Sequence, residues 1–415
     1  VQIDRVWRAA GKMVLPSDYY AVVHDTALTG RAWYHDAPVR SEPALLGCSG
    51  HGILGSGEGD EQQQVHLHFG GTHGHEHYDT LNLNWWGHGR EVLSETRYRE
   101  IPGSDSTREW HRATAGHVTV VIDEHDQSGR FGGNEIDLTE DDEIRGMLSW
   151  RYRDMGQGNT RNHGNPLLFD GLWPEVQAME AEGENSYDPR PDLYRRTVVA
   201  VDLGGGDGYL VDIFRVRGGE THDFMLHGCR DEPQVLTLSE PVASASGTVH
   251  SFVTLTGRAS PGGGWHATFE SPDGVRTTSR FLSPASPEVL VGRAPAMRRD
   301  ADSELLAVRN EGGESTFVVV HELTGGPSRI TSAELVGGLD EEVVALRVRL
   351  GDREDVIVSA LDEATVSLPE GLTFVGRLAY LRREGGLATA ARVFDGRRLV
   401  DGSVLSIEGL SPLEG

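Results

Sequence analysis

The chain has 415 residues, 64 of them acidic and 38 basic, so its formal net charge at pH 7 is −26. This excess of negative charge argues against nucleic acid or an anionic membrane as the main partner, because both repel an acidic protein. Lys12 is the only lysine, so arginine supplies almost all the positive charge. Since arginine holds carboxylate and sulfate groups by two parallel hydrogen bonds, we expect any anionic substrate to be bound by local arginines.

Residues 1–14 have apolar side chains at nearly helical spacing, which predicts one short helix that ends before Leu15 and Pro16. From Tyr19 onward, short apolar runs separated by glycine, proline and aspartate indicate antiparallel strands. No second substantial helix is predicted, except a turn or two near 140–147. The clearest expected strands are 20–23, 65–69, 118–122, 197–203, 209–216, 251–255, 316–320, 343–350 and 356–361.

These elements predict an all-β fold, a multi-stranded antiparallel β-sandwich followed by a second, smaller C-terminal β-sandwich domain. We expect residues 1–14 to be the end of a helical domain or a linker, residues 15–330 to form the central sandwich, and residues 331–415 to form the C-terminal sandwich. The segment 128–192 is the least regular and predicts long loops around one strand at 176–184. The glycine-rich run 204–208 predicts a hairpin loop, not a phosphate cradle.

The two cysteines, Cys48 and Cys229, allow at most one intramolecular disulfide and exclude a cysteine-only zinc site. No apolar run reaches membrane-spanning length, so no membrane partner is expected. The amino terminus has neither an initiator methionine nor a signal-peptide pattern, and we interpret it as a cut edge.

Five of the eighteen histidines lie between His66 and His77, and no other stretch has so many groups able to bind metal or transfer protons. On an extended strand, His73, His75 and His77 would share one face because side chains alternate. The intervening glycines favour a turn that delivers His75 and His77 to the start of a strand through Leu81. A run of surface histidines is the simpler alternative.

The passage from His75 to Leu81, together with residues 89–93 and 110–123, resembles the heparinase II/III family of polysaccharide lyases. In that family a His-x-His-x-x-Asp-like opening leads a β-strand, and a His-Asn-Thr-Val-Val-Asp-like segment follows later. Residues 194–199, 209–228 and 317–322 extend the resemblance, which is strongest from 15 to 228.

The resemblance implies a lyase that cleaves a uronic-acid polysaccharide by β-elimination. Family members join an amino-terminal toroid of paired helices, which supplies a catalytic tyrosine, to carboxy-terminal β-sandwiches. This chain resembles only the sandwich part, so we expect the toroid to come from a truncated precursor or a second chain. A secreted or periplasmic location is favoured, the cytoplasm is not excluded, and a homo-oligomer is left open.

Carried over by position, His75 matches the catalytic histidine, while His77 and His117 match ligands of a structural zinc. The remaining family ligand is typically aspartate, and the corresponding position here is Glu95, which keeps a carboxylate on a longer arm. A second departure is the pair Gly116 and Val118, where the family often has Ala-His-Asn. Metal identity is therefore open.

β-Elimination requires neutralisation of the uronate carboxylate, removal of the C5 proton and protonation of the leaving oxygen at C4. His75 is the expected base or carboxylate-neutralising group, and Tyr98 is a weaker candidate for proton transfer. Substrate carboxylate or sulfate would be bound by Arg97, Arg99 and Arg112. For His66, His68 and His73 we expect only supporting positions.

Two other functions compete with the lyase. A cupin-like metalloenzyme also presents His-x-His, but it needs a glutamate a few residues after His77, and none is there. A non-catalytic β-sandwich that binds carbohydrate or holds a structural metal fits as well. A nucleophilic hydrolase is poorly supported because no Gly-x-Ser-x-Gly motif occurs.

Overall fold

The computed structural model describes residues 2–21, 35–70, 77–96, 105–127, 164–283, 286–297, 301–337, 342–402 and 405–408. Within these ranges the chain forms two α-helices, α1 (Gln2–Lys12) and α2 (Asp105–Arg112), and is otherwise built from β-strands and short turns. The predicted all-β antiparallel sandwich is confirmed. Helix α2 was not predicted, and the turn expected near 140–147 lies outside the described residues. Neither described helix is long and apolar enough to span a membrane.

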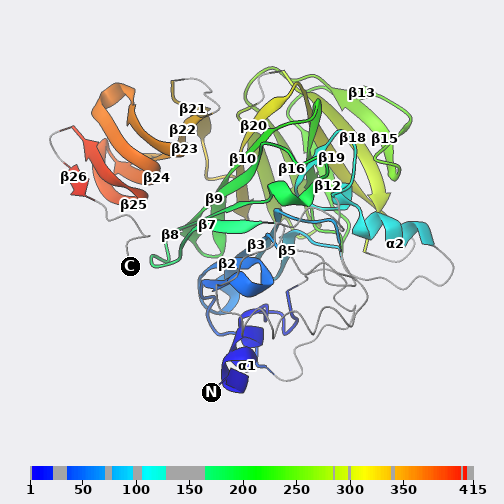
Figure 1. The fold of residues 1–415 in the computed structure, drawn as a ribbon, viewed down its shortest axis with the longest axis horizontal. Coiled ribbons are helices and arrows are strands. Elements are labelled where there is room, and N and C mark those ends of the chain that lie inside the picture. The colour runs from blue at the N-terminus through cyan, green and yellow to red at the C-terminus, as the bar shows by residue number, and fades with distance from the viewer. Residues whose placement is uncertain are drawn as a thin grey trace.

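An eight-stranded antiparallel sheet forms the centre of the molecule (Figure 1). Its strands in spatial order are β12 (Val235–Leu238), β16 (Trp265–Glu270), β17 (Arg276–Phe281), β20 (Glu314–Thr324), β10 (Asp207–Arg217), β9 (Leu193–Gly204), β8 (Val176–Glu182) and β7 (Asn165–Asp170). Successive residues of a strand point to opposite faces, so Leu210 and Phe214 enter one core while Val211 and Ile213 enter another. This sheet is therefore buried on both faces.

The hairpin between β9 and β10 turns at Gly205 and Gly206, whose φ angles are 70° and 79°. Residues with a Cβ rarely adopt such angles, which explains the glycine-rich run. It is a hairpin loop, as its position between two apolar runs indicated.

We call the face of the central sheet that carries Leu210 and Phe214 the inner face, and the opposite one the outer face. A seven-stranded sheet packs over part of the inner face. Its strands in order are β13 (Ala243–Ser244), β15 (Val253–Ala259), β18 (Glu288–Pro295), β19 (Asp302–Glu311), β11 (Thr221–His227) and β6 (Val120–Ile122), with β14 (Thr248–Val249) paired to β15. Phe224 and Leu306 join the core that the two sheets share. On the other side, Met225 and Leu305 pack against Trp110 of α2.

A five-stranded sheet completes the cover of the inner face. It consists of β1 (Ala44–Leu46), β2 (His51–Ser56), β3 (Gln63–His68), β4 (Asn82–Gly87) and β5 (Arg90–Leu93). Val65, Leu67 and Trp85 point from it into the shared core. Strand alternation places His66 and His68 on the other face, where they are nonetheless buried. A sheet with one apolar face and one buried polar face is unusual, because buried polar groups are costly unless they are paired. The polar face of this sheet is therefore the candidate location of the functional site.

The C-terminal sheet has six strands: β21 (Ser332–Leu335), β22 (Val343–Leu350), β23 (Arg353–Ser367), β24 (Leu372–Glu384), β25 (Leu387–Asp401) and β26 (Leu405–Glu408). It lies to one side of the central sheets in Figure 1, and its residues Leu346, Ile357 and Tyr380 pack on the outer face of the eight-stranded sheet. The register between β24 and β25 shifts where Gly376 and Gly396 pair. The domain limits expected from the sequence stay a prediction.

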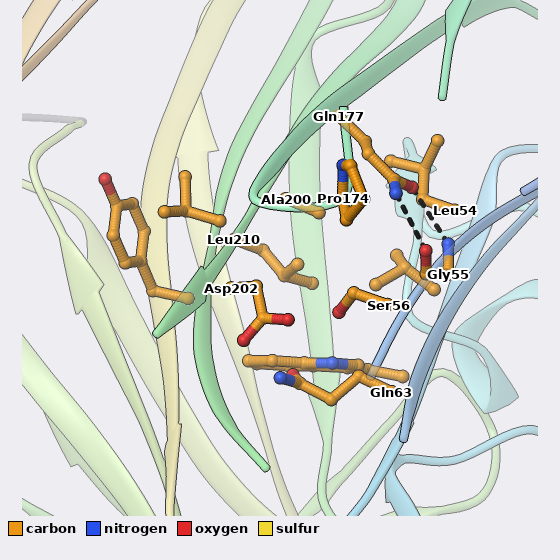
Figure 2. Close-up of a pocket in the computed structure, with 13 residues that line it drawn as sticks. Leu54, Gly55, Ser56, Gln63, Pro174, Gln177, Ala200, Asp202 and Leu210 are labelled. Atoms are coloured by element: carbon orange, nitrogen blue, oxygen red, sulfur yellow. Dashed lines mark hydrogen bonds between the residues drawn. The ribbon is translucent and has the colours of Figure 1, made fainter. Parts of the chain in front are cut away.

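The five-stranded and eight-stranded sheets meet without a shared strand ladder. Gln177 of β8 instead accepts a hydrogen bond from the Gly55 main-chain N–H at 2.9 Å and donates one to the Gly55 carbonyl at 2.7 Å (Figure 2). A cavity of about 20 Å³ beside this pair has room for about one water molecule. Val65 and Trp85 line it, so it lies on the apolar face of the small sheet, away from the histidines. It is too small to hold a sugar.

Candidate functional site

Four ligand-type side chains meet beside the polar face of the five-stranded sheet: His77, Asp79, Glu95 and His117. We call them the histidine–carboxylate cluster. His77 and Asp79 lie in the turn before β4, and Glu95 lies two residues after the end of β5. His117 follows a short 3₁₀ turn that leads to β6. Three separate stretches of chain thus supply the four side chains.

The cluster is compact and closed to solvent. Its four ligand atoms all lie within 4.8 Å of one another, and none of the side chains is more than 3% exposed. Glu95 Oε1 lies 2.7 Å from Nδ1 of His117 and 3.6 Å from Nδ1 of His77. The structure thus brings together His77, Glu95 and His117, which the sequence analysis named as metal ligands; their role as ligands stays a prediction.

Asp79 is the member that sequence reasoning missed. It stands two residues after His77, as His77 stands two after His75, so the same alternation that grouped the histidines could have included it. The resemblance implies a carboxylate ligand at the position of Glu95, whereas Asp79 lies much closer to His77 in the sequence.

Burial sets the protonation of the cluster. Burial raises the pKa of the Asp79 carboxyl well above its usual range, and the neighbouring Glu95 charge raises it further. Burial would also raise the pKa of Glu95, but His117 and His77 hold that pKa well below its usual range. Burial lowers the pKa of His117. Burial and the Glu95 charge thus favour the protonated form of Asp79, whereas the two histidines favour the ionised form of Glu95.

The donor set fits a divalent metal ion. Two imidazoles and two carboxylates are ligands that Zn²⁺ accepts, at about 2.0–2.2 Å each. Ligand atoms around one such ion lie roughly 3.3 Å apart by tetrahedral geometry, and those of the cluster, within 4.8 Å, reach that spacing with small side-chain movements. A divalent ion would also remove the conflict between the two buried carboxylates.

The Glu95 carboxylate is held at both oxygens by neighbouring groups. The main-chain N–H of Thr96 donates to Oε1 at 2.7 Å, and the Asn82 side-chain amide donates to Oε2. Asn82 Oδ1 also accepts from the main-chain N–H of Val118 at 2.8 Å. Asn82 therefore ties Glu95 to the residue next to His117, and such outer contacts orient metal ligands.

A buried arginine, Arg230, interacts electrostatically with Glu95. Arg230 donates from Nη2 to the Gly116 carbonyl at 2.5 Å, and its guanidinium lies 5.6 Å from the ring centre of Trp110. Burial lowers the pKa of Arg230 to about 10, while the Glu95 charge opposes that fall. The Gly116 departure from the family pattern thus lies where a Cβ would come 2.6 Å from the Trp110 carbonyl.

The histidines of the five-stranded sheet form a chain of contacts. His66 Nε2 lies 3.1 Å from Gln64 Oε1, and His66 Nδ1 lies 2.9 Å from His51 Nε2. His68 Nε2 lies 3.7 Å from Asp79 Oδ1, at the edge of the cluster. Burial lowers the pKa of His51 to about 4 and that of His66 well below its usual range. Burial thus favours the neutral form of His51 and of His66 at physiological pH.

Of the predicted substrate-binding residues, only Arg112 lies in the described part of the chain. It ends α2 and is half-buried, with its guanidinium 5.6 Å from the centre of the Tyr78 ring. The Tyr78 main-chain N–H donates to the Arg112 carbonyl at 2.9 Å, which fixes Arg112 next to His77. The other predictions, His73, His75, Arg97, Tyr98 and Arg99, lie outside the described residues.

Residues 65–164 match the family model described as heparinase II/III-like, C-terminal, and this range contains the whole cluster. Among solved structures, a heparinase III gene product is similar, with a TM-score of 0.58 and 14% identity over 86% of this chain and 52% of that one. The heparan sulfate lyase HepC from Pedobacter heparinus gives a TM-score of 0.59 and 12% identity over 87% and 53%. A search of curated proteins finds no significant match.

The resemblance to heparinase II/III-like lyases inferred from the sequence is therefore confirmed. At these identities the solved structures establish the fold alone. The chain spans about half the length of the structures it matches.

Proposed function

We propose that this chain is the β-sandwich part of a polysaccharide lyase that cleaves a uronic-acid-containing polysaccharide by β-elimination, with an α/α toroid completing the cleft. The observation that carries the proposal is the buried histidine–carboxylate cluster, which lies within the heparinase-like range and whose first member, His77, stands two residues after His75. A buried, closely packed cluster two residues away along the chain would help to hold His75 in the position that proton transfer requires.

In the proposed reaction, His75 removes the C5 proton of the uronate. The electron pair of the C5–H bond forms a C4–C5 double bond, the C4–O bond breaks, and the leaving oxygen takes a proton, for which Tyr98 is the candidate donor. Stabilising the carboxylate while charge develops on it dominates the barrier. Arg112, half-buried and held against Tyr78, supports an arginine contact to that carboxylate, together with Arg97 and Arg99.

We also propose that His77, Asp79, Glu95 and His117 hold a divalent metal ion, zinc being the best fit to this donor set. When bound, the ion would neutralise the two carboxylates and fix the three ligand-bearing stretches. Full burial favours a structural role, because a substrate cannot reach ligands that are at most 3% exposed. The same burial counts against the cupin-like reading, which needs an open coordination position.

The test is an assay for the unsaturated product, which absorbs in the ultraviolet, with a polypeptide that joins the toroid to this chain. The substrates are alginate, heparan sulfate, chondroitin, hyaluronan and ulvan. We expect one of them to be cleaved, and His75→Ala to abolish cleavage. Product formation that survives His75→Ala would remove His75 from the reaction.

A second candidate is a non-catalytic sandwich that binds carbohydrate or stabilises a neighbouring domain. It is favoured by the closed cluster, which needs no reaction to explain it. Binding of a uronate polymer without any unsaturated product, in the presence of the toroid, would support this function instead.

A further inference from the structure

A row of buried polar side chains crosses the inner face of the eight-stranded sheet. Ser279 Oγ lies 2.8 Å from His321 Nδ1, and His321 Nε2 lies 3.3 Å from Asp212 Oδ2. Arg196 donates to both oxygens of Asp212, from Nε at 2.9 Å and from Nη2 at 2.5 Å. We call these four side chains, which come from β17, β20, β10 and β9, the inner row. None of them is exposed to solvent.

The inner row contains a serine, a histidine and an aspartate, but it is not a hydrolase triad. The serine contacts Nδ1 and the aspartate contacts Nε2, which reverses the usual roles of the two nitrogens. All three side chains are closed to solvent, so no substrate reaches the serine. The row needs another explanation.

A buried ion pair often adds little to stability, because the cost of removing its charges from water offsets their attraction. The other contacts of the ion pair therefore indicate its role. At the far end of the inner row, Arg196 Nη1 donates to the Leu81 carbonyl at 2.7 Å and to the Val118 carbonyl at 2.5 Å. Leu81 lies two residues after Asp79, and Val118 directly follows His117. One guanidinium therefore grips two of the three stretches that carry the histidine–carboxylate cluster.

The position of Arg196 is itself tightly fixed. Asp212 holds one edge of its guanidinium, and the rings of Phe214 and Phe224 lie 5.3 and 5.7 Å from it. Burial would raise the pKa of Asp212, but Arg196 and His321 hold that pKa below its usual range, so the ion pair stays charged. A fixed, always charged group that meets two carbonyls sets the distance between them.

We infer that Arg196 is a positioning residue for the metal centre: through the Leu81 and Val118 carbonyls it sets the spacing of Asp79 and His117 without touching either side chain. This inference rests on the metal centre proposed above. It predicts that the affinity for the ion depends on a residue of the eight-stranded sheet that contacts no ligand atom.

The test compares Arg196→Lys with Arg215→Lys. Lysine can keep the charge opposite Asp212, but its single ammonium cannot also serve both carbonyls. Arg215 is the matched control, because it is an equally buried arginine on the adjacent strand whose side chain points to the opposite face, where it binds Ser359. The readouts are Zn²⁺ affinity by chelator competition and the visible absorption of the Co²⁺-substituted protein.

We expect Arg196→Lys to weaken Zn²⁺ binding about ten- to a hundred-fold, the usual range for outer contacts of metal sites, and to alter the Co²⁺ bands. Arg215→Lys should leave both unchanged, even where it lowers the urea midpoint of the metal-free protein. Wild-type affinity in Arg196→Lys, or an equal loss in Arg215→Lys, would overturn the inference.

A double variant covers the case in which Arg196→Lys fails to fold. Arg196→Met with Asp212→Leu removes both charges together, which leaves no unpaired ion in the core. It should fold and bind Zn²⁺ as weakly as Arg196→Lys is expected to. The two proposals can fail separately. If the wild type binds Zn²⁺ and the Arg196 variants bind it more weakly, but no unsaturated product forms with the toroid present, the lyase reaction is overturned and the role of Arg196 is supported. A wild type that takes up no Zn²⁺ overturns this inference.

Discussion

Two groups of buried charge lie on opposite faces of the eight-stranded sheet and end in different places. On the inner face, Arg196 and Asp212 lead to two main-chain carbonyls beside the histidine–carboxylate cluster. On the outer face, Arg353 binds Asp355 at 2.6 Å, and Tyr209 of β10 donates to the same carboxylate at 2.6 Å across to the six-stranded sheet. We call Tyr209, Asp355 and Arg353 the outer clamp.

Both groups contain an arginine paired with an aspartate. The effect of a mutation should therefore depend on what each pair contacts next: the carbonyls beside the cluster on the inner face, or the six-stranded sheet on the outer face. Loss of the inner contacts should change the spacing of ligands, whereas loss of the outer clamp should change how firmly two sheets adhere. Metal content and unfolding free energy are thus separate readouts for the two faces, and the variants below are chosen to separate or merge them.

The largest expected effect is on the inner side, from Glu95→Gln. Glutamine keeps the shape but loses the charge that a divalent ion requires, and structural zinc sites contribute on the order of 10 kcal/mol to folding. We expect metal analysis after dialysis to find no stoichiometric ion. The control is Glu180→Gln, a buried carboxylate on the outer face that accepts from Thr197 at 2.6 Å and should leave metal content unchanged. Full metal content in Glu95→Gln would show that Glu95 is not a ligand.

On the outer side, Asp355→Asn should lower the free energy of unfolding by about 3 kcal/mol, because it leaves the partly buried Arg353 guanidinium without its carboxylate and the Tyr209 hydroxyl without a charged acceptor. Urea unfolding measures the loss. Metal affinity should stay at the wild-type value, since no outer-clamp residue contacts the cluster. A drop in metal affinity comparable to that of Arg196→Lys would erase the distinction between the two faces.

Acid should lower the free energy of unfolding through the buried histidine His51 of the five-stranded sheet. The pKa of His51 is lowered by burial to about 4, whereas an unfolded histidine titrates near pH 6.5. As the pH falls from about 6.5 to about 4, the unfolded chain takes up a proton that the folded chain refuses, so stability is lost. For His51 alone the loss is about 3 kcal/mol. His51→Gln should therefore show a shallower fall of the urea midpoint through this window, and parallel curves would contradict the prediction.

The smallest effects come from a matched pair of tyrosines on β9 and β10. Tyr209→Phe removes a hydrogen bond to the Asp355 carboxylate. Tyr194→Phe removes a hydrogen bond of 2.6 Å to the Val120 carbonyl and contacts of 3.0 and 3.1 Å with Thr119 and Gln127, both of which keep a bond to the Thr80 carbonyl. Bonds to charged groups contribute more, so we expect losses of about 2 kcal/mol for Tyr209→Phe and about 1 kcal/mol for Tyr194→Phe. Chemical denaturation measures both. The reverse order would show that the inner face, not the outer, is the more tightly held.

Much of the fold was predictable because local apolar patterns are strong. The runs 209–216 and 316–320 were expected as strands and lie within β10 and β20, and the run 176–184 contains β8. What the pattern could not provide is pairing, since β10 and β20 are neighbours although about a hundred residues separate them in sequence. Helix α2 was missed because its eight residues include only one strongly apolar side chain, Trp110.

The site was predictable only where residues are close in sequence or match a motif. His77, Glu95 and His117 were named from the resemblance, and the structure brings them together. Asp79 was overlooked, and Arg196 gave no signal at all, because nothing in Tyr-Arg-Arg-Thr distinguishes an arginine that binds two distant carbonyls from one on the surface. Such a role exists only after three sheets have assembled.

The contact between Gln177 and Gly55 has a practical consequence for protein engineering. The side-chain amide of Gln177 makes the two hydrogen bonds that a neighbouring strand would make to Gly55. The five-stranded sheet therefore contacts the eight-stranded sheet through a side chain, not through a continuous strand ladder. If this sheet is transferred to another scaffold, a glutamine at the position of Gln177 would pair with the main-chain groups of Gly55. A scaffold that offers leucine would leave the Gly55 peptide unpaired in a closed junction, at a cost of about 1–3 kcal/mol for each polar group.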